Sequence, residues 1–356
     1  MKKNVYLLLI ILLSIGFQSC GNSEEENTDN KAEVKNKEQP VDTTSDAVKL
    51  EQINAKIRMD PNNPNFYNER SYFYFKSAKM EEALLDINRC IKIDSTIPDF
   101  YISRGDIYFA QLKVEEAKNE FEKAKKVDLF FYKADLKLAK LYLYLRNYKK
   151  SMEYANSALK IDKHIAEGYF IKGSVYEEMR DSANASSSFQ TAIEQDPNYY
   201  DAYIRLGILY SKLPKNNKNR ALAYDYFNSA IDLRPDFIEG HYDKALYCQE
   251  NELHDEALEE YEKIIAIDPK FESAWHNKGY VYLVYKQDFK LAIEYFTKAI
   301  EIKSTYVGAF HNRALAWLKL GDIQRAKADF NAALAIDPQY DKSAIELDNL
   351  DKGKIN

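Results

Sequence analysis

The sequence predicts an all-α protein built from repeated pairs of helices, and three observations support this prediction. Short similar segments, most of which end in Asp or Asp-Pro, recur about every 34 residues along most of the chain. Within each period, small and aromatic residues recur at spacings of three and four, which place them on one helix face. Gly and Pro, which interrupt helices, number only 11 and 9 among 356 residues.

The period is defined by eight segments that align in one register. The first four segments begin 34 residues apart, and the later intervals are 38, 34, 35 and 34 residues. Two small insertions therefore interrupt one fixed repeat. The segments are IKID (91–94), KKVD (125–128), LKID (159–162), IEQDP (193–197), IDLRP (231–235), IAIDP (265–269), IEIK (300–303) and LAIDP (334–338).

Each period combines two helices with complementary faces. A large aromatic residue opens most first helices, and a small residue follows it four positions later. The second helix carries a small, an aromatic and a small residue, as in Ala117, Phe121 and Ala124. Small residues let two helices approach closely, and the rings fill the space between successive pairs. The opening aromatics are Tyr67, Tyr101, Tyr169, Tyr203, Trp275 and Phe310, and the small residues are Ser71, Gly105, Ala139, Gly173, Gly207, Ala245, Gly279 and Ala314.

This pattern resembles the tetratricopeptide repeat (TPR), over eight consecutive repeats in residues 64–340. The resemblance implies an all-α TPR superhelix, which is an α-solenoid of antiparallel helix pairs. Residues 48–63 predict an N-terminal flanking helix, and residues 341–356 predict a C-terminal capping helix and tail, because the outer faces of end repeats meet water. The eight repeats are expected at 64–97, 98–131, 132–165, 166–199, 200–237, 238–271, 272–306 and 307–340.

Three repeats depart from the pattern. The third has Asp135 where the opening aromatic belongs, which predicts looser packing at that point. The fifth inserts LPKNNKNR between its helices, which predicts a loop extended by four residues. The sixth places His241 and Cys248 at ring positions.

The N-terminus predicts a secretory signal peptide over residues 1–19. Basic Lys2 and Lys3 precede an apolar run from Val5 to Ile15, which is too short to span a bilayer as a mature helix. The residues around Cys20 resemble a bacterial lipobox, whose cysteine is lipidated and becomes the first residue of the mature chain; Phe17 departs from the usual Leu of this motif. We therefore expect lipidation of Cys20. A signal peptide with an incidental cysteine and a short membrane anchor are the alternatives.

Residues 20–47 predict a disordered acidic linker, because they contain no aromatic residue and no helical period. A flexible coil of this length spans about 30 Å root-mean-square. Glu24, Glu25 and Glu26 either keep the linker soluble or form an acidic signal like the one that sends some lipoproteins to the cell surface. The expected localisation is the outer membrane of the cell envelope, on its periplasmic or its surface-exposed face.

The sequence lacks the motifs that would indicate an enzyme. We find no Gly-rich phosphate loop, no G-x-S-x-G, no H-E-x-x-H and no paired-cysteine motif, so no catalytic residue, cofactor or metal is predicted. The formal charge of −6 argues against a nucleic-acid partner. Cys90 and Cys248 fall at interior positions and are expected to be buried free thiols, whereas Cys20 fits no repeat.

A recurring basic position and two histidines also call for an explanation. Basic residues that precede the small residue of the first helix are expected to pair with acidic neighbours or reach water, rather than to form a basic stripe. His276 and His311 share one repeat position, where lining of a groove is favoured over metal binding. The basic residues are Arg70, Arg104, Lys172, Lys244, Lys278 and Arg313.

The resemblance also implies a concave surface lined by positions two, five, nine and twelve of the first helices. Positions five and nine are mostly apolar or aromatic in the middle of the array, without a charged ladder, and about half of these residues are expected to pack between repeats. The expected partner-binding groove contains Tyr72, Ile102, Phe170, Ile204, Ile208, Tyr242, Leu246, His276, Tyr280 and His311.

The expected function is a non-enzymatic, lipid-anchored scaffold that binds partner proteins or peptides in this groove. Two specialised functions of the family are not supported. The carboxylate clamp needs Lys at position five and Asn at position nine of one repeat, and an asparagine ladder at position six is matched only by Asn277 and Asn312. The alternative is a glycan- or ligand-binding lipoprotein of an outer-membrane uptake complex, in which Trp275 or Tyr280 would stack on sugars.

Overall fold

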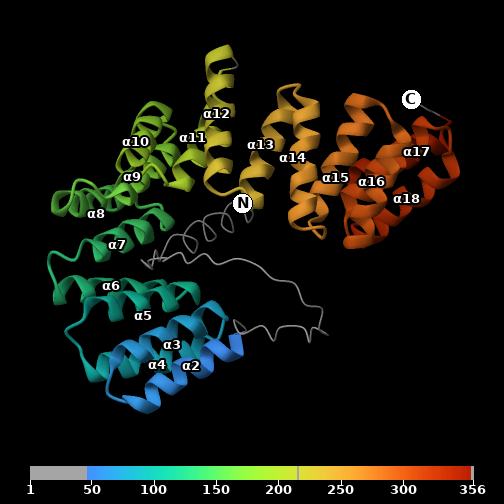
Figure 1. Ribbon diagram of the computed structural model, residues 1–356. Helices are drawn as coiled ribbons and strands as arrows, with labels where there is room; N and C mark the ends of the chain where they lie inside the picture. Colours follow the sequence, from blue (N-terminus) through green and yellow to red (C-terminus); the bar gives the residue numbers. More distant parts are fainter. Residues whose placement is uncertain (1–45, 215, 354–356) are drawn as a thin grey trace, which may run out of the picture. The chain divides into compact units, whose positions relative to one another are not determined.

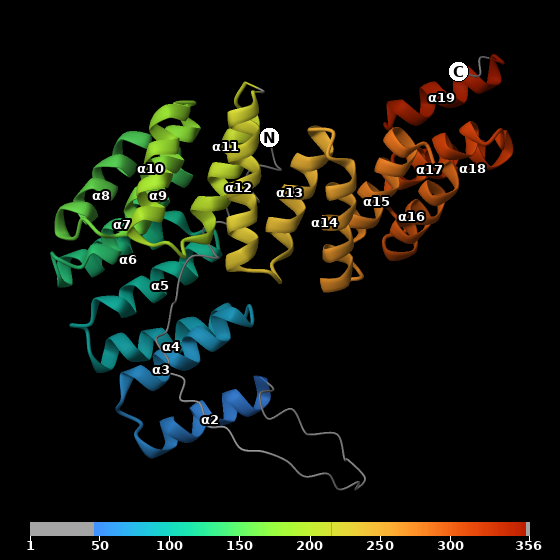
Figure 2. The ribbon, with the colours of Figure 1, turned by 45° about the horizontal axis from the view of Figure 1, so that its top comes forward.

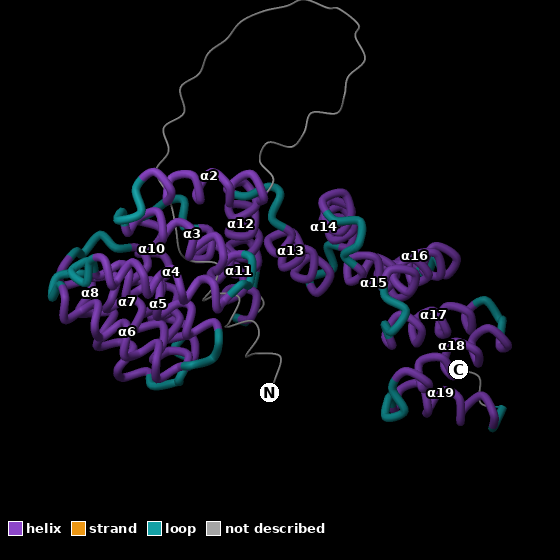
Figure 3. The backbone as a smooth tube through the Cα atoms, turned by 90° about the horizontal axis from the view of Figure 1, so that it is seen from below, coloured by secondary structure: helices purple, strands orange, loops and turns teal. Residues whose placement is uncertain are grey.

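The computed structural model describes residues 46–214 and 216–353. The predicted signal peptide, Cys20 and all but the last two residues of the predicted linker lie outside these ranges. The described residues form eighteen α-helices and one short π-helix, with no strand among them (Figure 3). None of these helices is both long and apolar enough to cross a bilayer. The predicted all-α class of repeated helix pairs is confirmed.

The chain divides after Gln195 into two compact units. The described part of the amino-terminal unit begins with α2 (Asp46–Met59), which packs against the first helix pair (Figure 1). The first helix of each pair packs on its own second helix, on the second helix of the preceding pair and on the neighbouring first helices. The four pairs are α3 (Pro64–Lys76) with α4 (Met80–Ile93), α5 (Pro98–Ala110) with α6 (Val114–Val127), α7 (Tyr132–Tyr144) with α8 (Tyr148–Ile161), and α9 (Ala166–Glu178) with α10 (Ser182–Gln195).

The carboxy-terminal unit repeats this arrangement and ends with α19 (Asp341–Asp351), which packs against α18 (Figure 2). The flanking helices α2 and α19 thus occupy the two sequence segments predicted as caps. The pairs are α11 (Tyr200–Lys212) with α12 (Asn217–Leu233), α13 (Ile238–Glu250) with α14 (His254–Ile267), α15 (Glu272–Val281) and η1 (Tyr282–Lys286) with α16 (Phe289–Ile302), and α17 (Val307–Lys319) with α18 (Ile323–Ile336).

Close approach within each pair explains the small residues of the first helices. A Cβ atom placed on Gly105 would lie 2.4 Å from the ring of Phe121, and one on Gly173 would lie 2.6 Å from the ring of Phe189. Both rings are buried and pack directly on the backbone of the facing helix. Glycine at these positions therefore lets the aromatic residue of the second helix fill the core of its own pair.

The turn inside seven of the eight pairs contains one residue with a positive φ angle. This left-handed conformation costs a residue with a Cβ atom about 1–2 kcal/mol relative to its usual conformations. Glycine, which carries no such penalty, occupies the position in only one of the seven pairs that have it. The residues are Ala78, Leu112, Arg146, Arg180, Glu252, Gln287 and Gly321.

The two insertions are absorbed mainly by helices. In the fifth repeat, α12 has 17 residues instead of the 14 found in α4, whereas the loop at 213–216 is only one residue longer than the loop at 77–79. The prediction of a four-residue loop extension is therefore wrong. Asn216 caps the longer helix by accepting a hydrogen bond from the backbone N–H of Asn219 (2.8 Å), so α12 begins earlier. In the seventh repeat, the single extra residue is accommodated in the π-helix η1, whose turn is wider.

The expectation of looser packing at Asp135 is also wrong. Its side chain is fully buried, forms an ion pair with Lys125, and accepts a hydrogen bond from the Ser157 hydroxyl (3.0 Å). The ammonium of Lys125 also lies 5.3 Å from the centre of the Tyr154 ring. An ion pair capped by an aromatic ring thus occupies the site where other repeats place their opening aromatic.

Candidate partner-binding surface

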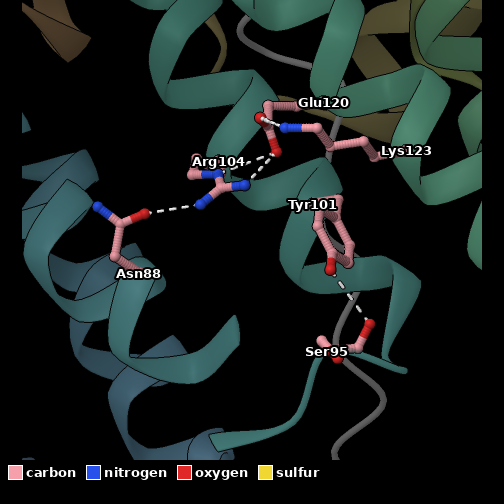
Figure 4. Close-up of polar contacts among 6 residues, drawn as sticks. All are labelled: Asn88, Ser95, Tyr101, Arg104, Glu120 and Lys123. Atoms are coloured by element: carbon pink, nitrogen blue, oxygen red, sulfur yellow. Dashed lines mark hydrogen bonds and ion pairs between the residues drawn. The ribbon is translucent and has the colours of Figure 1, made fainter. Parts of the chain in front are cut away.

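Most of the recurring basic residues of the first helices form ion pairs with a neighbouring second helix. Arg70, Arg104 and Arg313 each bind the carboxylate found sixteen residues later on their own second helix, at 2.6–2.9 Å. Figure 4 shows that Arg104 also donates to the side-chain oxygen of Asn88 on the preceding second helix (2.7 Å). Lys244 pairs with Glu260 of its own second helix, whereas Lys278 pairs with Glu262 of the preceding second helix. For these five residues, the predicted pairing with acidic neighbours is confirmed.

Arg70 and Arg104 are bound to carboxylates of their own pairs, and the first helices α3 and α5 leave an apolar hollow between them. Its volume is about 230 Å³. The aromatic and aliphatic side chains of Tyr72, Phe75 and Ile107 provide its apolar lining, and the remaining lining residues are Asn68, Glu69, Ser71, Ser103 and Asp106. Tyr72 is 38% exposed, so its ring is accessible to a partner.

A second, more polar hollow of about 480 Å³ lies between α2 and α3. Tyr72 and Glu69 line both hollows and therefore separate them. The carboxylate of Glu69 accepts two hydrogen bonds from Lys56 of α2 (both 2.9 Å), which fixes one wall of the second hollow. The flanking helix thus contributes to the surface.

Beyond the first hollow, the first helices of the amino-terminal unit are joined by ion pairs. Asp99 pairs with Lys133 (3.1 Å), Asp106 pairs with Lys137 (2.7 Å), and Lys140 pairs with Glu167. These contacts run from α5 through α7 to α9. The expectation of a face without a charged ladder is therefore wrong in this unit. The ion pairs form between charged residues at positions two, six and nine of neighbouring first helices.

The corresponding helices of the carboxy-terminal unit are joined by uncharged groups instead. Asn277 donates to the Tyr242 hydroxyl (3.2 Å), and Asn312 donates to Nε2 of His276 (3.0 Å). Nδ1 of His276 lies 3.1 Å from the side-chain oxygen of Asn277 and donates to it. Burial lowers the pKa of His276, so its ring is neutral with the proton on Nδ1, as this chain of contacts requires.

Two acidic side chains of the same unit have raised pKa values. Burial, followed by the nearby Glu239 carboxylate, raises the pKa of Asp243 to about 7, and burial also raises the pKa of Glu239. Arg205 opposes both shifts. Asp243 therefore holds its proton far more readily than an exposed aspartate. No group of three or more His, Cys, Asp or Glu residues in the described ranges is arranged to hold a metal ion.

Family models agree with this repeated geometry. Tetratricopeptide repeat models match residues 64–97, 98–129, 136–165, 166–199, 188–223, 238–271, 272–306 and 307–340. The chain belongs to the tetratricopeptide repeat family.

Individual proteins match shorter parts of this TPR chain. It is 32% identical to the protein FlbA of Caulobacter vibrioides over 113 residues, which are 32% of this chain and 19% of FlbA. It is 28% identical to the human mitochondrial import receptor subunit TOM70 over 138 residues, which are 38% of this chain and 22% of TOM70. The matched parts thus span about a fifth of these relatives. The solved C-terminal part of a TPR protein from Cytophaga hutchinsonii is similar in fold, with a TM-score of 0.55, 20% identity, and coverage of 67% of this chain and 96% of that structure.

The structure divides the ten residues predicted to line the TPR groove into three groups. Tyr72 is exposed and lines the hollows of the amino-terminal unit. Ile208, Tyr242, Leu246, His276 and Tyr280 are half-buried on first helices of the carboxy-terminal unit. Ile102, Phe170, Ile204 and His311 are buried. The last group packs within the repeats and presents little surface to a partner.

Of the eight residues that line the apolar hollow, only Tyr72 belongs to the predicted groove. Phe75 occupies position twelve of the first repeat, which the family pattern places on the inner face, but the apolar character of the groove was predicted from positions five and nine alone. Ser103 and Ile107 occupy positions six and ten of the second repeat, which lie beside the expected inward positions. Their contribution depends on how α5 packs against α3, and a single repeat does not contain that information.

Proposed function

We propose that this chain is a non-enzymatic scaffold that binds a partner protein or peptide on the inner face of its first helices and is anchored to the outer membrane by a lipid on Cys20. The observation that carries the proposal is the apolar hollow between α3 and α5. A concave apolar surface with a few polar groups at its rim suits an apolar side chain of a partner, while Asn68 and Ser103 offer hydrogen bonds to the partner's backbone.

The relatives support the binding role in general terms. The match to a mitochondrial import receptor subunit covers 38% of this chain, and the name of that protein describes a receptor. Several buried carboxylates of the described residues join the two helices of a pair, as Asp86, Glu120 and Asp329 do. A scaffold explains the extended repetition better than a catalytic function does.

Partner binding is tested by photo-crosslinking at the hollow. A benzophenone amino acid at Ser103 is expected to form a defined protein adduct in the native cell envelope, and Phe75→Ala, which removes part of the hollow's wall, should weaken that adduct at least five-fold. The matched control carries the same probe at Leu85, which is 70% exposed on α4 but lies on a second helix. Equal adducts at both sites, or none at Ser103, would contradict the proposed surface.

The anchor is tested separately at Cys20. The wild type is expected to incorporate labelled palmitate and to remain with the membrane after a high-salt wash, because several acyl chains on one residue anchor firmly. Cys20→Ser should lose the label, whereas Cys90→Ser should keep it, because Cys90 is buried in the first repeat. Palmitate in the Cys20→Ser protein would disprove this assignment.

A further inference from the structure

The turn at residues 128–131 joins α6 to α7 (Figure 1), and it carries two large apolar side chains that are exposed. Leu129 is 68% exposed and Phe130 is 78% exposed. The turn itself is well formed, because the backbone N–H of Phe130 donates to the Asp128 carboxylate (2.9 Å) and the N–H of Phe131 donates to the Asp128 carbonyl (3.2 Å). The exposure is therefore a property of an ordered turn.

The other turns of the same chain show that the fold does not require apolar residues here. The seven turns that follow the other second helices all place polar residues or proline at the two equivalent positions. A tetratricopeptide turn thus forms equally well without them, so packing does not explain Leu129 and Phe130. The equivalent pairs are Ser95–Thr96, Lys163–His164, Pro197–Asn198, Pro235–Asp236, Pro269–Lys270, Ser304–Thr305 and Pro338–Gln339.

Lysines surround this turn on the same edge of the amino-terminal unit. Lys92, Lys126 and Lys160 occupy one repeat position in the last turns of α4, α6 and α8, and all three are exposed. Lys163 is exposed in the next turn. None of the four forms an ion pair with any residue in the described ranges. The same position holds Glu194, Asp232, Ala266, Glu301 and Ala335 in the other repeats.

Acidic residues of this edge are already used by the turns. Asp94, Asp128 and Asp162 accept backbone N–H groups of Thr96, Phe130 and His164 at 2.8–2.9 Å. Their carboxylates lie against the turn backbone, whereas the lysine side chains are exposed and able to extend from the surface. The edge therefore combines a protruding apolar pair with flexible positive charges.

We propose that this edge, formed by Leu129, Phe130 and the lysines at positions 92, 126, 160 and 163, rests on an anionic phospholipid surface. Leu129 and Phe130 would enter the boundary between headgroups and acyl chains, and the lysines would lie among the headgroup phosphates. A protruding pair suits a deformable lipid layer, whereas a protein partner is better served by a hollow such as that between α3 and α5.

The position of the unit in the chain supports this occupant. The 45 residues that precede the described structure join it at α2, which belongs to this same unit. A lipid on Cys20 would therefore hold the amino-terminal unit near the bilayer, within the reach of the predicted linker. This part of the inference rests on the proposed anchor, but the lipid affinity of the edge does not.

The first test measures vesicle binding by the full chain carrying Cys20→Ser, which removes the anchor from the measurement. Vesicles contain phosphatidylcholine with about 30% phosphatidylglycerol, and flotation measures the bound fraction. Leu129→Ser with Phe130→Thr, which copies the turn after α4, is expected to lower binding at least five-fold. Leu85→Ser removes an exposed leucine elsewhere and should leave binding unchanged. Any contribution of the N-terminal segment is common to all variants, so equal binding by the three proteins would overturn the proposal.

The second test places an environment-sensitive nitrobenzoxadiazole dye on Phe130→Cys in the same Cys20→Ser protein. Cys90 and Cys248 do not compete for the dye, because both are fully buried and burial raises the pKa of each thiol to about 12. Vesicles are expected to shift the emission to shorter wavelength and to allow quenching by spin-labelled lipid. The matched control is Thr305→Cys, at the equivalent position of the seventh repeat. The proposal would be overturned if vesicles shifted the emission equally at the two sites, or if vesicles without protein left the emission at residue 130 unchanged. Either result would favour a protein ligand for the turn.

Discussion

The second and sixth repeats stabilise a buried glutamate in related ways, and the difference between them shows how one helix pair can become sensitive to pH. Glu120 is 5% exposed and Glu260 is 2% exposed. Each accepts a hydrogen bond from a basic residue sixteen positions earlier, Arg104 or Lys244, and from a lysine three positions later. The frame of the two pairs is therefore the same.

The two repeats differ at the position of the opening aromatic. In the second repeat, the Tyr101 hydroxyl donates to the Ser95 carbonyl (3.2 Å) and leaves Glu120 to other donors. In the sixth, Nε2 of His241 lies 2.8 Å from the Pro235 carbonyl while Nδ1 lies 2.6 Å from Glu260. Both of these partners are acceptors, so both ring nitrogens donate and the ring is protonated.

The charges of the sixth repeat stabilise one another. The hydrogen bond to Glu260 raises the pKa of His241 despite its burial. Burial alone would raise the pKa of Glu260, but hydrogen bonds from His241, Lys244 and Lys263 outweigh it and hold this pKa at about 2. A histidine in place of tyrosine thus donates a hydrogen bond to the turn and another to the carboxylate. Because the charge of the histidine depends on pH, the stability of this helix pair depends on pH as well.

The largest expected effect comes from Glu260→Gln, which leaves Lys244 and protonated His241 buried without their counter-charge. We expect the sixth repeat to lose about 3–5 kcal/mol of stability. Hydrogen exchange of peptides from α14 at pH 7 measures this loss. Glu120→Gln in the second repeat should cost less, because Arg104 keeps its bond to Asn88. A larger loss in the second repeat would break the comparison.

The next effect comes from two histidines of the carboxy-terminal unit whose pKa values are shifted in opposite directions. Burial, and secondarily Lys342, lowers the pKa of His311 to about 4, so the unfolded chain binds a proton below about pH 6.5 that the native ring does not. Stability at α18 and α19 should therefore fall by up to about 3 kcal/mol between pH 6.5 and 4. The raised pKa of His241 gives the reverse: its stabilisation is fully present below about pH 6.5 and is lost as the pH rises through the folded value.

Hydrogen exchange at several pH values, corrected for the intrinsic exchange rate, separates the two histidines. His311→Gln should flatten the acid dependence at α18 and α19, and His241→Tyr, which copies the second repeat, should flatten the alkaline dependence at α14. Unchanged slopes in these variants would show that other groups control the pH dependence.

The smallest effect concerns the turns inside the same two repeats. Leu112 and Glu252 hold positive φ angles of 60° and 68°. Leu112→Gly and Glu252→Gly should each stabilise the protein by about 1 kcal/mol, because glycine adopts this conformation without a steric penalty. Urea denaturation measures both changes. Ala110→Gly, within α5, is the control and should destabilise by a similar amount. A loss of stability in the turn variants would contradict the proposed strain.

The fold was predictable because the 34-residue pattern is local and recurs along the chain. A ring such as Phe121 and a glycine such as Gly105 report the contact of two helices within one repeat. The hollow between α3 and α5 was not predictable in this way. At position six, the small Ser103 lies at the hollow, whereas Lys137 on the next first helix pairs with Asp106. Whether two neighbouring first helices leave a hollow or are joined by an ion pair thus depends on residues from both repeats. The residue type at one repeat position does not predict it.

The π-helix η1 has a consequence for the length of the chain. The extra residue of the seventh repeat is taken up before Gln287, which has the left-handed conformation found at this turn in six other pairs. Asp288 then caps α16 by accepting the N–H of Leu291 (3.1 Å), as Asn147 caps α8 by accepting the N–H of Lys150. The change in residue number is thereby confined to the five residues of η1, and the phase of the repeat that follows is preserved. Single-residue insertions at the end of a first helix are thus a form of variation that this architecture tolerates without rebuilding its interfaces.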